Sequence, residues 1–340
     1  MSVTISDIAE KVGVSPMTVS RALRGGGRIG ADTRARILAT ARELGYKPNT
    51  AARVMRSGRT GNVGLLLSTD HETSTLPPGL VWGIESALEE KNWNLFLARM
   101  PDGEKLTAGE LPRVLQQHLV DGLLVNYTHQ LPSGLTATVR SQQLPAIWLN
   151  IRLDDAPCVY PDDYNSAREA TRYLLELGHK KIAYANLTEL EGFDPALAHY
   201  STLDRYKGYA QTMQETGLTP RRLWGVELTQ CYAHCLAAFK APDRPTAVLC
   251  YNRYTIGAVL LAAAAANLEV PRDLSVCLFH DEPCVEFGRR ITTMKLPEFE
   301  MGVTAVGMLA DWLADPGRVP ASKALPCRWY FQEECAKPPA

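Results

Sequence analysis

The chain of 340 residues is long enough for a small domain and a larger one, and its 46% hydrophobic and 21% charged residues are typical of a globular protein. Eight cysteines without a Cys-x-x-Cys spacing exclude a disulfide scaffold, and no charged start followed by an apolar run marks a signal peptide. The longest apolar stretch, residues 255–268, is too short to span a membrane. We therefore expect a cytoplasmic protein with reduced thiols and no membrane partner.

The formal net charge of −1 conceals an uneven distribution. Residues 1–60 contain eleven Lys and Arg and four acidic residues, a net charge of +7. The remaining 280 residues contain 25 basic and 33 acidic residues, a net charge of −8. A basic head on an acidic body is expected when only the head meets the phosphates of nucleic acid.

Three short helices are predicted within the first 45 residues. Ser6 or Asp7 can cap a first helix, and Gly13 then permits a tight turn. Ser15 is a good N-cap for a second helix, and a third helical pattern spans residues 32–44. Two helices joined by a Gly-containing turn form the helix-turn-helix arrangement. Such a pair alone also fits a solvated three-helix bundle, and the charge of +7 favours the DNA-binding interpretation.

The second predicted helix carries side chains that suit the major groove of DNA. The guanidinium fork of Arg21 can bond O6 and N7 of guanine together, and Met17 can contact a thymine methyl group. Ser15, Thr18 and backbone N–H groups at the helix start can anchor phosphates, which sets the register without reading the sequence.

The run TISDIAEKVGVSPMTVSRAL, followed by TRARILATARELGYKPNTAARVMRSGRTGNVGLLL, closely resembles the head of the lactose and galactose repressor (LacI/GalR) family. The resemblance covers about the first 67 residues and implies a double-stranded DNA operator, bound by a homodimer. In this family the two residues that open the recognition helix choose the operator sequence, and here they are Pro16 and Met17. The DNA-binding residues implied by the resemblance are Thr4, Ser15, Pro16, Met17, Thr18, Ser20, Arg21, Arg24, Asn49, Ala52, Arg53, Met55 and Arg56.

Residues 49–56 (NTAARVMR) look like the hinge helix of the family. In that family two copies enter the minor groove side by side and wedge an apolar side chain, usually Leu, between base pairs; this sequence has Met55. An eight-residue helix is marginal in isolation, so we expect the hinge to order only with DNA and a partner hinge.

Apolar runs alternate with amphipathic stretches from residue 63 onward. This alternation predicts an α/β body of parallel sheets flanked by helices, and the number of strands implies two lobes. The expected strands are residues 63–67, 94–97, 122–125, 146–149, 182–186, 247–251, 276–279 and 292–296. Ligands in such folds bind beyond the carboxyl ends of strands, and clefts between lobes are favoured. No GxGxxG or GxxxxGK[ST] motif occurs, so no nucleotide-phosphate cradle is expected.

The body resembles the effector-binding domain of the same family, which has the two-lobed fold of periplasmic sugar-binding proteins. Matching stretches are VDGLLV (120–125), YLLELGHKKIAY (173–184), RYKGY (205–209), TAVLCYN (246–252), VPRDLSVCLFHD (270–281) and ITTMKLP (291–297). The resemblance is weakest at residues 69–78 and 187–203, both expected to border the ligand.

The resemblance divides the chain into three parts. It implies a helix-turn-helix head (1–47), a hinge helix and linker (48–60), and an effector-binding and dimerisation domain (61–340). Within the last, the N-lobe comprises about 61–160 and 293–322 and the C-lobe about 161–292 and 323–340. The tail after residue 332 shows no leucine heptad, which favours a dimer over a tetramer.

Carried over residue by residue, the ligand contacts of the family fall on Asn150, Tyr160, Arg205, Asn252 and His280. The fork of Arg205 suits vicinal hydroxyls or a carboxylate, and Asn252 offers both a donor and an acceptor. Tyr160 or Trp148 could stack on a pyranose face.

Three departures from the family pattern bear on the charge of the effector. Arg253 stands where the family usually has Asp, Asn150 stands where some sugar-binding members have Asp, and His280 replaces the first Asp of a frequent Phe-Asp-Asp run. Each change removes a carboxylate or adds a cation, so we hypothesise a small carbohydrate-like effector with negative charge, such as a sugar acid or sugar phosphate. In the equally good alternative, Arg253 points to solvent and His280 is a neutral hydrogen-bonding side chain.

Metal and enzyme chemistry are not expected. Cys231, His234 and Cys235 lack a second ligand pair at zinc-finger spacing, so we expect no metal site and no cofactor. No G-x-S-x-G or HExxH motif occurs, and the sequence predicts no enzyme. The alternative is a sugar-active enzyme fused to a DNA-binding head, which would turn over a bound sugar. The family's default mode is repression with ligand-induced release, although some members use the ligand as corepressor.

Overall fold

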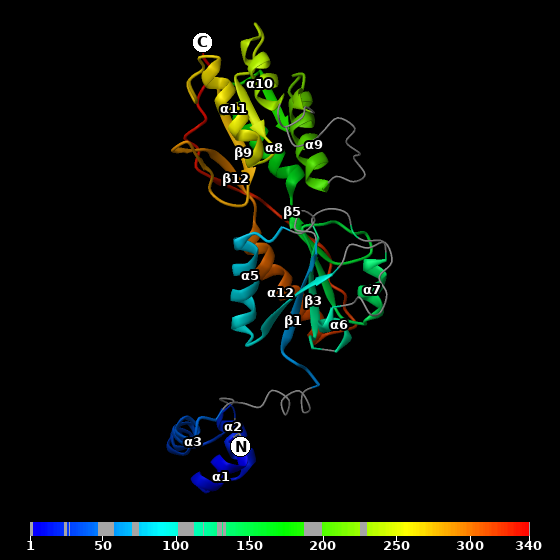
Figure 1. Cartoon of the computed structure of the whole chain (residues 1–340), viewed down its shortest axis with the longest axis vertical. Coiled ribbons are helices and arrows are strands. Elements are labelled where there is room, and N and C mark those ends of the chain that lie inside the picture. The colour runs from blue at the N-terminus through cyan, green and yellow to red at the C-terminus, as the bar shows by residue number, and fades with distance from the viewer. Residues whose placement is uncertain are drawn as a thin grey trace. The chain divides into compact units, whose positions relative to one another are not determined.

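The computed structural model describes most of the chain, in two units. The described residues are 3–23, 26, 28–46, 58–69, 75–100, 112–117, 119–127, 131, 134–186, 199–224 and 230–339. The chain divides into the compact units Met1–Thr60 and Gly61–Ala340, which are treated separately below (Figure 1). Among the described residues, no helix combines the length and the apolar character needed to cross a membrane.

The first unit, the head, contains α1 (Ile5–Val12), α2 (Pro16–Leu23) and α3 (Ala31–Glu43), as the sequence predicts. Its buried core is small and apolar, and consists of Ile8, Ala9, Val12, Val19, Ala22, Ile37 and Ala41. Gly13 ends α1 in the left-handed conformation, with φ 74°, which glycine adopts without steric cost. This turn sets the angle at which α2 leaves α1.

The cap of the first helix differs from the prediction. Thr4, and not Ser6 or Asp7, is the N-cap of α1. The Thr4 hydroxyl accepts from the Asp7 N–H at 3.4 Å, and the Asp7 carboxylate accepts from the Thr4 N–H at 2.7 Å, which is a reciprocal capping box. Asp7 is the third helical residue and therefore cannot be the cap. For α2 the prediction is confirmed, because Ser15 Oγ accepts from the Thr18 N–H at 3.1 Å.

The first lobe of the body is built on a six-stranded parallel sheet in the order β13-β5-β4-β3-β1-β2. Its strands are β1 (Asn62–Ser68), β2 (Asn94–Met100), β3 (Gly122–Asn126), β4 (Ala146–Leu149), β5 (Cys158–Pro161) and β13 (Lys323–Leu325). One face is covered by α5 (Pro78–Glu90) and α12 (Glu298–Ala314), and the other by α6 (Arg113–Gln116) and α7 (Leu135–Ser141). Burial of both faces explains why inner strands such as β1 and β3 are continuous apolar runs.

The second lobe repeats this plan with the strand order β14-β12-β9-β8-β6-β7. Its strands are β6 (Ile182–Asn186), β7 (Arg221–Trp224), β8 (Ala247–Cys250), β9 (Ser275–His280), β12 (Thr292–Lys295) and β14 (Arg328–Tyr330), of which β14 runs antiparallel to its neighbour. One face is covered by α8 (Asp163–Glu176) and α9 (Tyr200–Glu215), and the other by α10 (Cys231–Lys240) and α11 (Arg253–Ala265). A short hairpin of β10 (Val285–Glu286) and β11 (Arg289–Arg290) follows β9.

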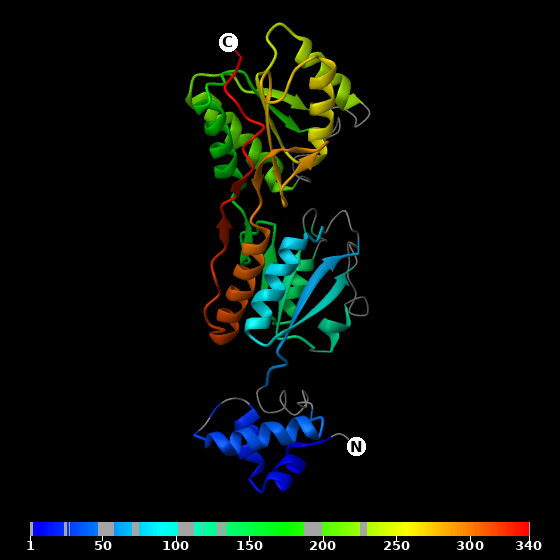
Figure 2. The ribbon, with the colours of Figure 1, turned by 90° about the vertical axis from the view of Figure 1, so that its left-hand side faces the viewer.

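The chain crosses between the lobes after β5, after β12 and after β13, and the last crossing is the red segment of Figure 2. The boundaries expected at 292 and 322 fall too early. β12 pairs with β9 of the second lobe, and β13 pairs with β5 of the first. Both strands are short, and only their hydrogen-bonding partners reveal the lobe to which each belongs.

Two helices of the first lobe approach unusually closely. A Cβ added at Gly83 of α5 would lie 2.1 Å from the carbonyl oxygen of Phe299, and one added at Gly302 of α12 would lie 2.5 Å from the backbone nitrogen of Ile84. Only glycine permits this approach of backbones. The contact fixes the start of α12, which lies at the crossing between the lobes (Figure 1).

Candidate functional site

The outward surface of α2 carries the side chains expected to contact bases. Pro16, Met17 and Arg21 are exposed, with 63% of Met17 accessible to solvent. Ser15 lies directly before the helix, and its hydroxyl oxygen is 2.9 Å from that of Thr18. The head thus presents one helix with apolar, polar and basic groups toward solvent, which is the arrangement that enters a major groove.

Two of the predicted DNA contacts have other roles in the head. Ser20 is only 8% exposed and lies on the packed side of α2, so it is not presented to a base. Thr4 is exposed, and its hydroxyl and N–H are engaged with Asp7 in the cap of α1. The remaining predicted contacts lie outside the described residues, and these are Arg24, Asn49, Ala52, Arg53, Met55 and Arg56. The predicted hinge helix therefore stays a prediction.

The body contains a cavity of about 800 Å³ lined from both lobes. The first lobe contributes residues 75–78, Asn150 and Glu298, and the second contributes Arg205 and His280 among others. The wall therefore includes residues from 69–78 and 187–203, the segments where the family resemblance is weakest. Loops and helix starts beyond the carboxyl ends of the strands form most of it, as expected for parallel α/β lobes.

Five of the predicted effector contacts line this cavity, and they are Asn150, Arg205, Asn252, Arg253 and His280. Tyr160 and Trp148 do not line it. Trp148 is 2% exposed, because β4 is an inner strand covered on both faces and the indole packs into the apolar core. Tyr160 packs edge-on against Tyr200, with 5.7 Å between the ring centroids. The predicted stacking of Trp148 on a sugar is therefore wrong, and stacking on Tyr160 stays a prediction, while Tyr251 and Tyr254 line the wall.

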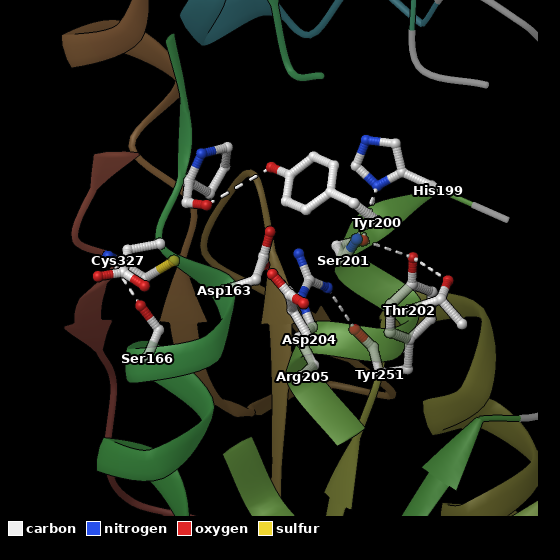
Figure 3. A network of polar contacts seen from close by, with 12 residues as sticks. Asp163, Ser166, His199, Tyr200, Ser201, Thr202, Asp204, Arg205, Tyr251 and Cys327 are labelled. Carbon is white, nitrogen blue, oxygen red and sulfur yellow. Dashed lines mark hydrogen bonds and ion pairs between the residues drawn. The ribbon is translucent and has the colours of Figure 1, made fainter. Parts of the chain in front are cut away.

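Arg205 lines the cavity and belongs to the polar network drawn in Figure 3. Its Nε donates to Oδ1 of Asp163 at 2.6 Å and its Nη1 donates to the Tyr251 carbonyl at 2.7 Å. The guanidinium carbon lies 4.4 Å from the centre of the Phe279 ring. Both charged side chains of this pair are buried, so removal of either leaves an uncompensated charge.

Two further basic side chains of the wall also contact carboxylates. Nε of Arg253 lies 2.6 Å from Oε1 of Glu286, and Nδ1 of His280 lies 2.6 Å from Oδ1 of Asp281. Burial opposes ionisation of Asp281, but its hydrogen bond to and electrostatic interaction with His280 hold the pKa of this carboxyl below its usual value. Arg253 and His280 thus each have a carboxylate partner among the described cavity residues.

Sequence reasoning missed a hydrogen-bonded chain that begins at His199. Nε2 of His199 is 2.8 Å from the carbonyl oxygen of Asn150, and Nδ1 accepts from the hydroxyl and N–H of Ser201. A carbonyl oxygen only accepts, so Nε2 carries the proton. Ser201 Oγ continues the chain to the hydroxyl of Tyr251 at 2.9 Å (Figure 3). The weak resemblance around residues 187–203 was the only sequence signal for this chain.

The Cys-x2-His-Cys cluster of α10 has the properties of core packing. Cys231 and Cys235 are buried, and burial raises the pKa of Cys235 to about 12, which keeps the thiol protonated and unreactive. Within the described part of the chain, no group of three His, Cys, Asp or Glu side chains could hold a metal ion.

Comparisons with known proteins agree with both units. Residues 4–49 match the bacterial regulatory proteins of the lacI family, and residues 171–333 match a periplasmic binding protein-like domain. The HTH-type transcriptional regulator RegA of Clostridium saccharobutylicum is 29% identical over 92% of this chain and 93% of its own length. The HTH-type transcriptional repressor PurR of Pectobacterium carotovorum subsp. carotovorum (strain PC1) is 27% identical over 91% of this chain and 89% of its own.

Solved structures share the fold over nearly the whole chain. The lac repressor dimer bound to operator and the anti-inducer ONPF gives a TM-score of 0.69 at 22% identity, over 99% of this chain and 100% of that one. The complex of the transcriptional regulator CelR with cellobiose gives 0.60 at 23% identity, over 98% of this chain and 99% of that one. The relatives are transcription regulators, which sets aside the alternative of a sugar-active enzyme. The chain therefore joins a helix-turn-helix domain of the lacI family to a two-lobed, periplasmic binding protein-like body, and over nearly its whole length it is similar to DNA-binding transcription regulators.

Proposed function

We propose that this chain represses transcription in the cytoplasm by binding a near-palindromic operator as a homodimer, and that a carbohydrate-like molecule in the cavity changes its affinity for the operator. The observation that carries the proposal is the presence, in one chain, of an exposed recognition surface on α2 and a cavity of about 800 Å³ lined from both lobes. A ligand that contacts both lobes favours one lobe arrangement over others, which is how it can bias a separate DNA-binding unit.

The recognition surface defines what the operator should look like. Pro16 and Met17 have no side-chain donors, so they contribute apolar contact and shape. Arg21 is the exposed side chain of this surface that can form the bidentate contact with guanine. Two heads related by a two-fold axis would then read half-sites about one helical turn apart, roughly 34 Å.

Exposed apolar side chains on the body supply a surface for the second copy. Trp82 of α5 is 62% exposed and Leu97 of the edge strand β2 is 58% exposed, and α5 and β2 pack in the same lobe. Neighbouring exposed apolar side chains, unlike single ones, mark surfaces where proteins associate. Because a palindromic operator requires two heads, we assign this surface to the homodimer. Trp82→Glu should convert the dimer to a monomer in analytical ultracentrifugation, and an unchanged dimer would remove the surface from the proposal.

The polar groups of the cavity suit a hydroxyl-rich effector. Asn252 uses Oδ1 to cap α11, accepting from the Thr255 N–H at 3.3 Å, and this leaves its amide N–H groups as donors. The hypothesis of an anionic sugar acid or sugar phosphate rested on three positions, Asn150, Arg253 and His280, where a carboxylate is lost or a potential cation is added. Arg253 and His280 each contact a carboxylate, which offsets positive charge at these positions, and we therefore favour a neutral sugar over an acidic one.

The test is operator selection from random duplex DNA with the full-length protein, with and without a panel of neutral and acidic sugars. We expect a palindrome to be enriched and its recovery to change with a neutral sugar. Weaker recovery identifies an inducer and stronger recovery a corepressor. Failure to enrich any sequence would refute the operator proposal, and a response to acidic sugars alone would restore the anionic effector.

A further inference from the structure

Glu298 is a buried acid in the wall of the cavity. It is the first residue of α12, directly after the crossing from the second lobe, and it is 3% exposed. Its position is fixed by the close approach of α5, because a Cβ at Gly79 would lie 3.2 Å from Cβ of Glu298. The carboxyl group therefore has a defined place between the lobes.

This carboxyl group forms no hydrogen bond and no ion pair within 4.0 Å among the described residues. The charged groups that act on it from other elements are the carboxylates Asp281 and Asp163 and the cations Arg205 and Lys295. Arg205 is bonded to Asp163, and His280 is bonded to Asp281, so those two carboxylates already have partners. The first turn of α5 brings no acidic side chain and, by its sequence, no basic one.

A buried carboxyl group without a partner is stable mainly in its neutral form. Burial, aided by the charges of Asp281 and Asp163, raises the pKa of Glu298 to about 8, against the opposing effect of Arg205 and Lys295. At pH 7 the group is thus predominantly a carboxylic acid, which has an O–H to donate. Asp281, by contrast, is ionised and can only accept.

We propose that Glu298 is a specificity-determining residue of the cavity, donating a hydrogen bond from its neutral carboxylic acid to an acceptor oxygen of a hydroxyl-rich effector. The inference rests on the proposed function, because it names a contact of the same effector. Ionisation removes the donor and adds a negative charge close to Asp163 and Asp281. Effector affinity should therefore be constant at lower pH and fall once Glu298 ionises.

The first experiment measures the protonation of Glu298 in the full-length protein without effector. Carboxyl ¹³C NMR of glutamate-labelled protein should show one resonance that titrates near pH 8 and is missing from Glu298→Gln. A Glu298 resonance that titrates near its usual value of about 4.3 overturns the inference.

The second experiment measures binding of D-ribose, D-glucose and cellobiose by calorimetry between pH 6 and pH 9.5. For a sugar that binds, wild-type affinity should fall about tenfold per pH unit above the pKa. Glu298→Gln keeps a donor and should bind with a flat profile, whereas Glu298→Ala should bind weakly at every pH. Glu300→Gln, whose carboxylate is exposed and paired with Arg328 at 3.5 Å, is the matched control and should follow the wild type.

The outcomes separate the two proposals. A wild-type profile that is flat, or that rises with pH, overturns the role of Glu298 while leaving the carbohydrate effector intact. If none of the three sugars binds although Glu298 titrates near pH 8, the carbohydrate effector is refuted and the donor role fails with it. Binding that falls above pH 8 in the wild type and not in Glu298→Gln supports both.

Discussion

The head and the cavity differ in how their chemistry is assembled. The recognition surface is local, since Pro16, Met17 and Arg21 lie on one eight-residue helix and face solvent. The cavity is non-local, since its wall draws on residues from position 75 to position 298. On the head a side chain can be judged by itself, whereas in the cavity the charge around a side chain can depend on a partner far along the chain. Arg253, for example, is neutralised by Glu286, 33 positions later.

The largest change in stability is expected when the buried ion pair between Asp163 and Arg205 in the cavity is broken. Asp163→Ala leaves Arg205 buried without its carboxylate and should lower the free energy of unfolding by about 3–5 kcal/mol. Urea denaturation followed by fluorescence measures the change. The control is Arg140→Ala, which breaks the exposed pair with Asp155 and should have little effect. Equal losses in both variants would contradict the importance of burial.

Glu298→Gln should show that the stability of the protein depends on the protonation of a cavity residue. The usual pKa of a glutamate is about 4.3, and in the folded protein that of Glu298 is raised to about 8, so the folded state holds this proton more tightly. Its unfavourable ionisation therefore costs stability progressively as the pH rises from about 4.3 to 8. The Gln variant should be more stable than the wild type by several kcal/mol at pH 8.5 and no more stable at pH 4.5. Thermal unfolding at the two pH values measures this, and a pH-independent difference would argue against it.

Arg21→Ala tests the independence of the head. It should weaken operator binding by about 1–3 kcal/mol and relax the base preference at one position of each half-site. Stability of the body and sugar binding should not change, because no side chain of the cavity is altered. Repeating the operator selection with this variant is the measurement, and an unchanged preference would remove Arg21 from base readout.

The smallest effect is expected at the cap of α1. Thr4→Ala removes the hydroxyl that accepts from the Asp7 N–H and should destabilise the head by about 1 kcal/mol. Ser6→Ala is the control, because Ser6 lies next to the cap and is exposed. Circular dichroism of the two variants on heating distinguishes them, and identical melting would assign the cap elsewhere.

The sequence predicts those features that depend on local pattern. The three helices of the head and the inner strands of both lobes other than β5 follow from spacing and apolar runs. The cap at Thr4, the lobe of β12 and the strands β5, β7, β13 and β14 do not, because each is decided by a hydrogen-bonding partner. In the cavity, the family resemblance predicted Asn150 and Arg205 as ligand contacts, and both residues line the wall. The carboxylate partner of Arg253 could not be predicted from the sequence, and this contact is one reason why we propose a neutral effector.

The most direct test of the whole account is the coupling between cavity and operator. Operator affinity is measured by fluorescence anisotropy with and without a saturating neutral sugar from the selection, and sugar affinity is measured with and without saturating operator. Because linkage is reciprocal, the two ratios must agree, and we expect a change of roughly 5- to 150-fold. A ratio of one in both directions, with each ligand binding normally, would contradict the claim that the cavity controls DNA binding.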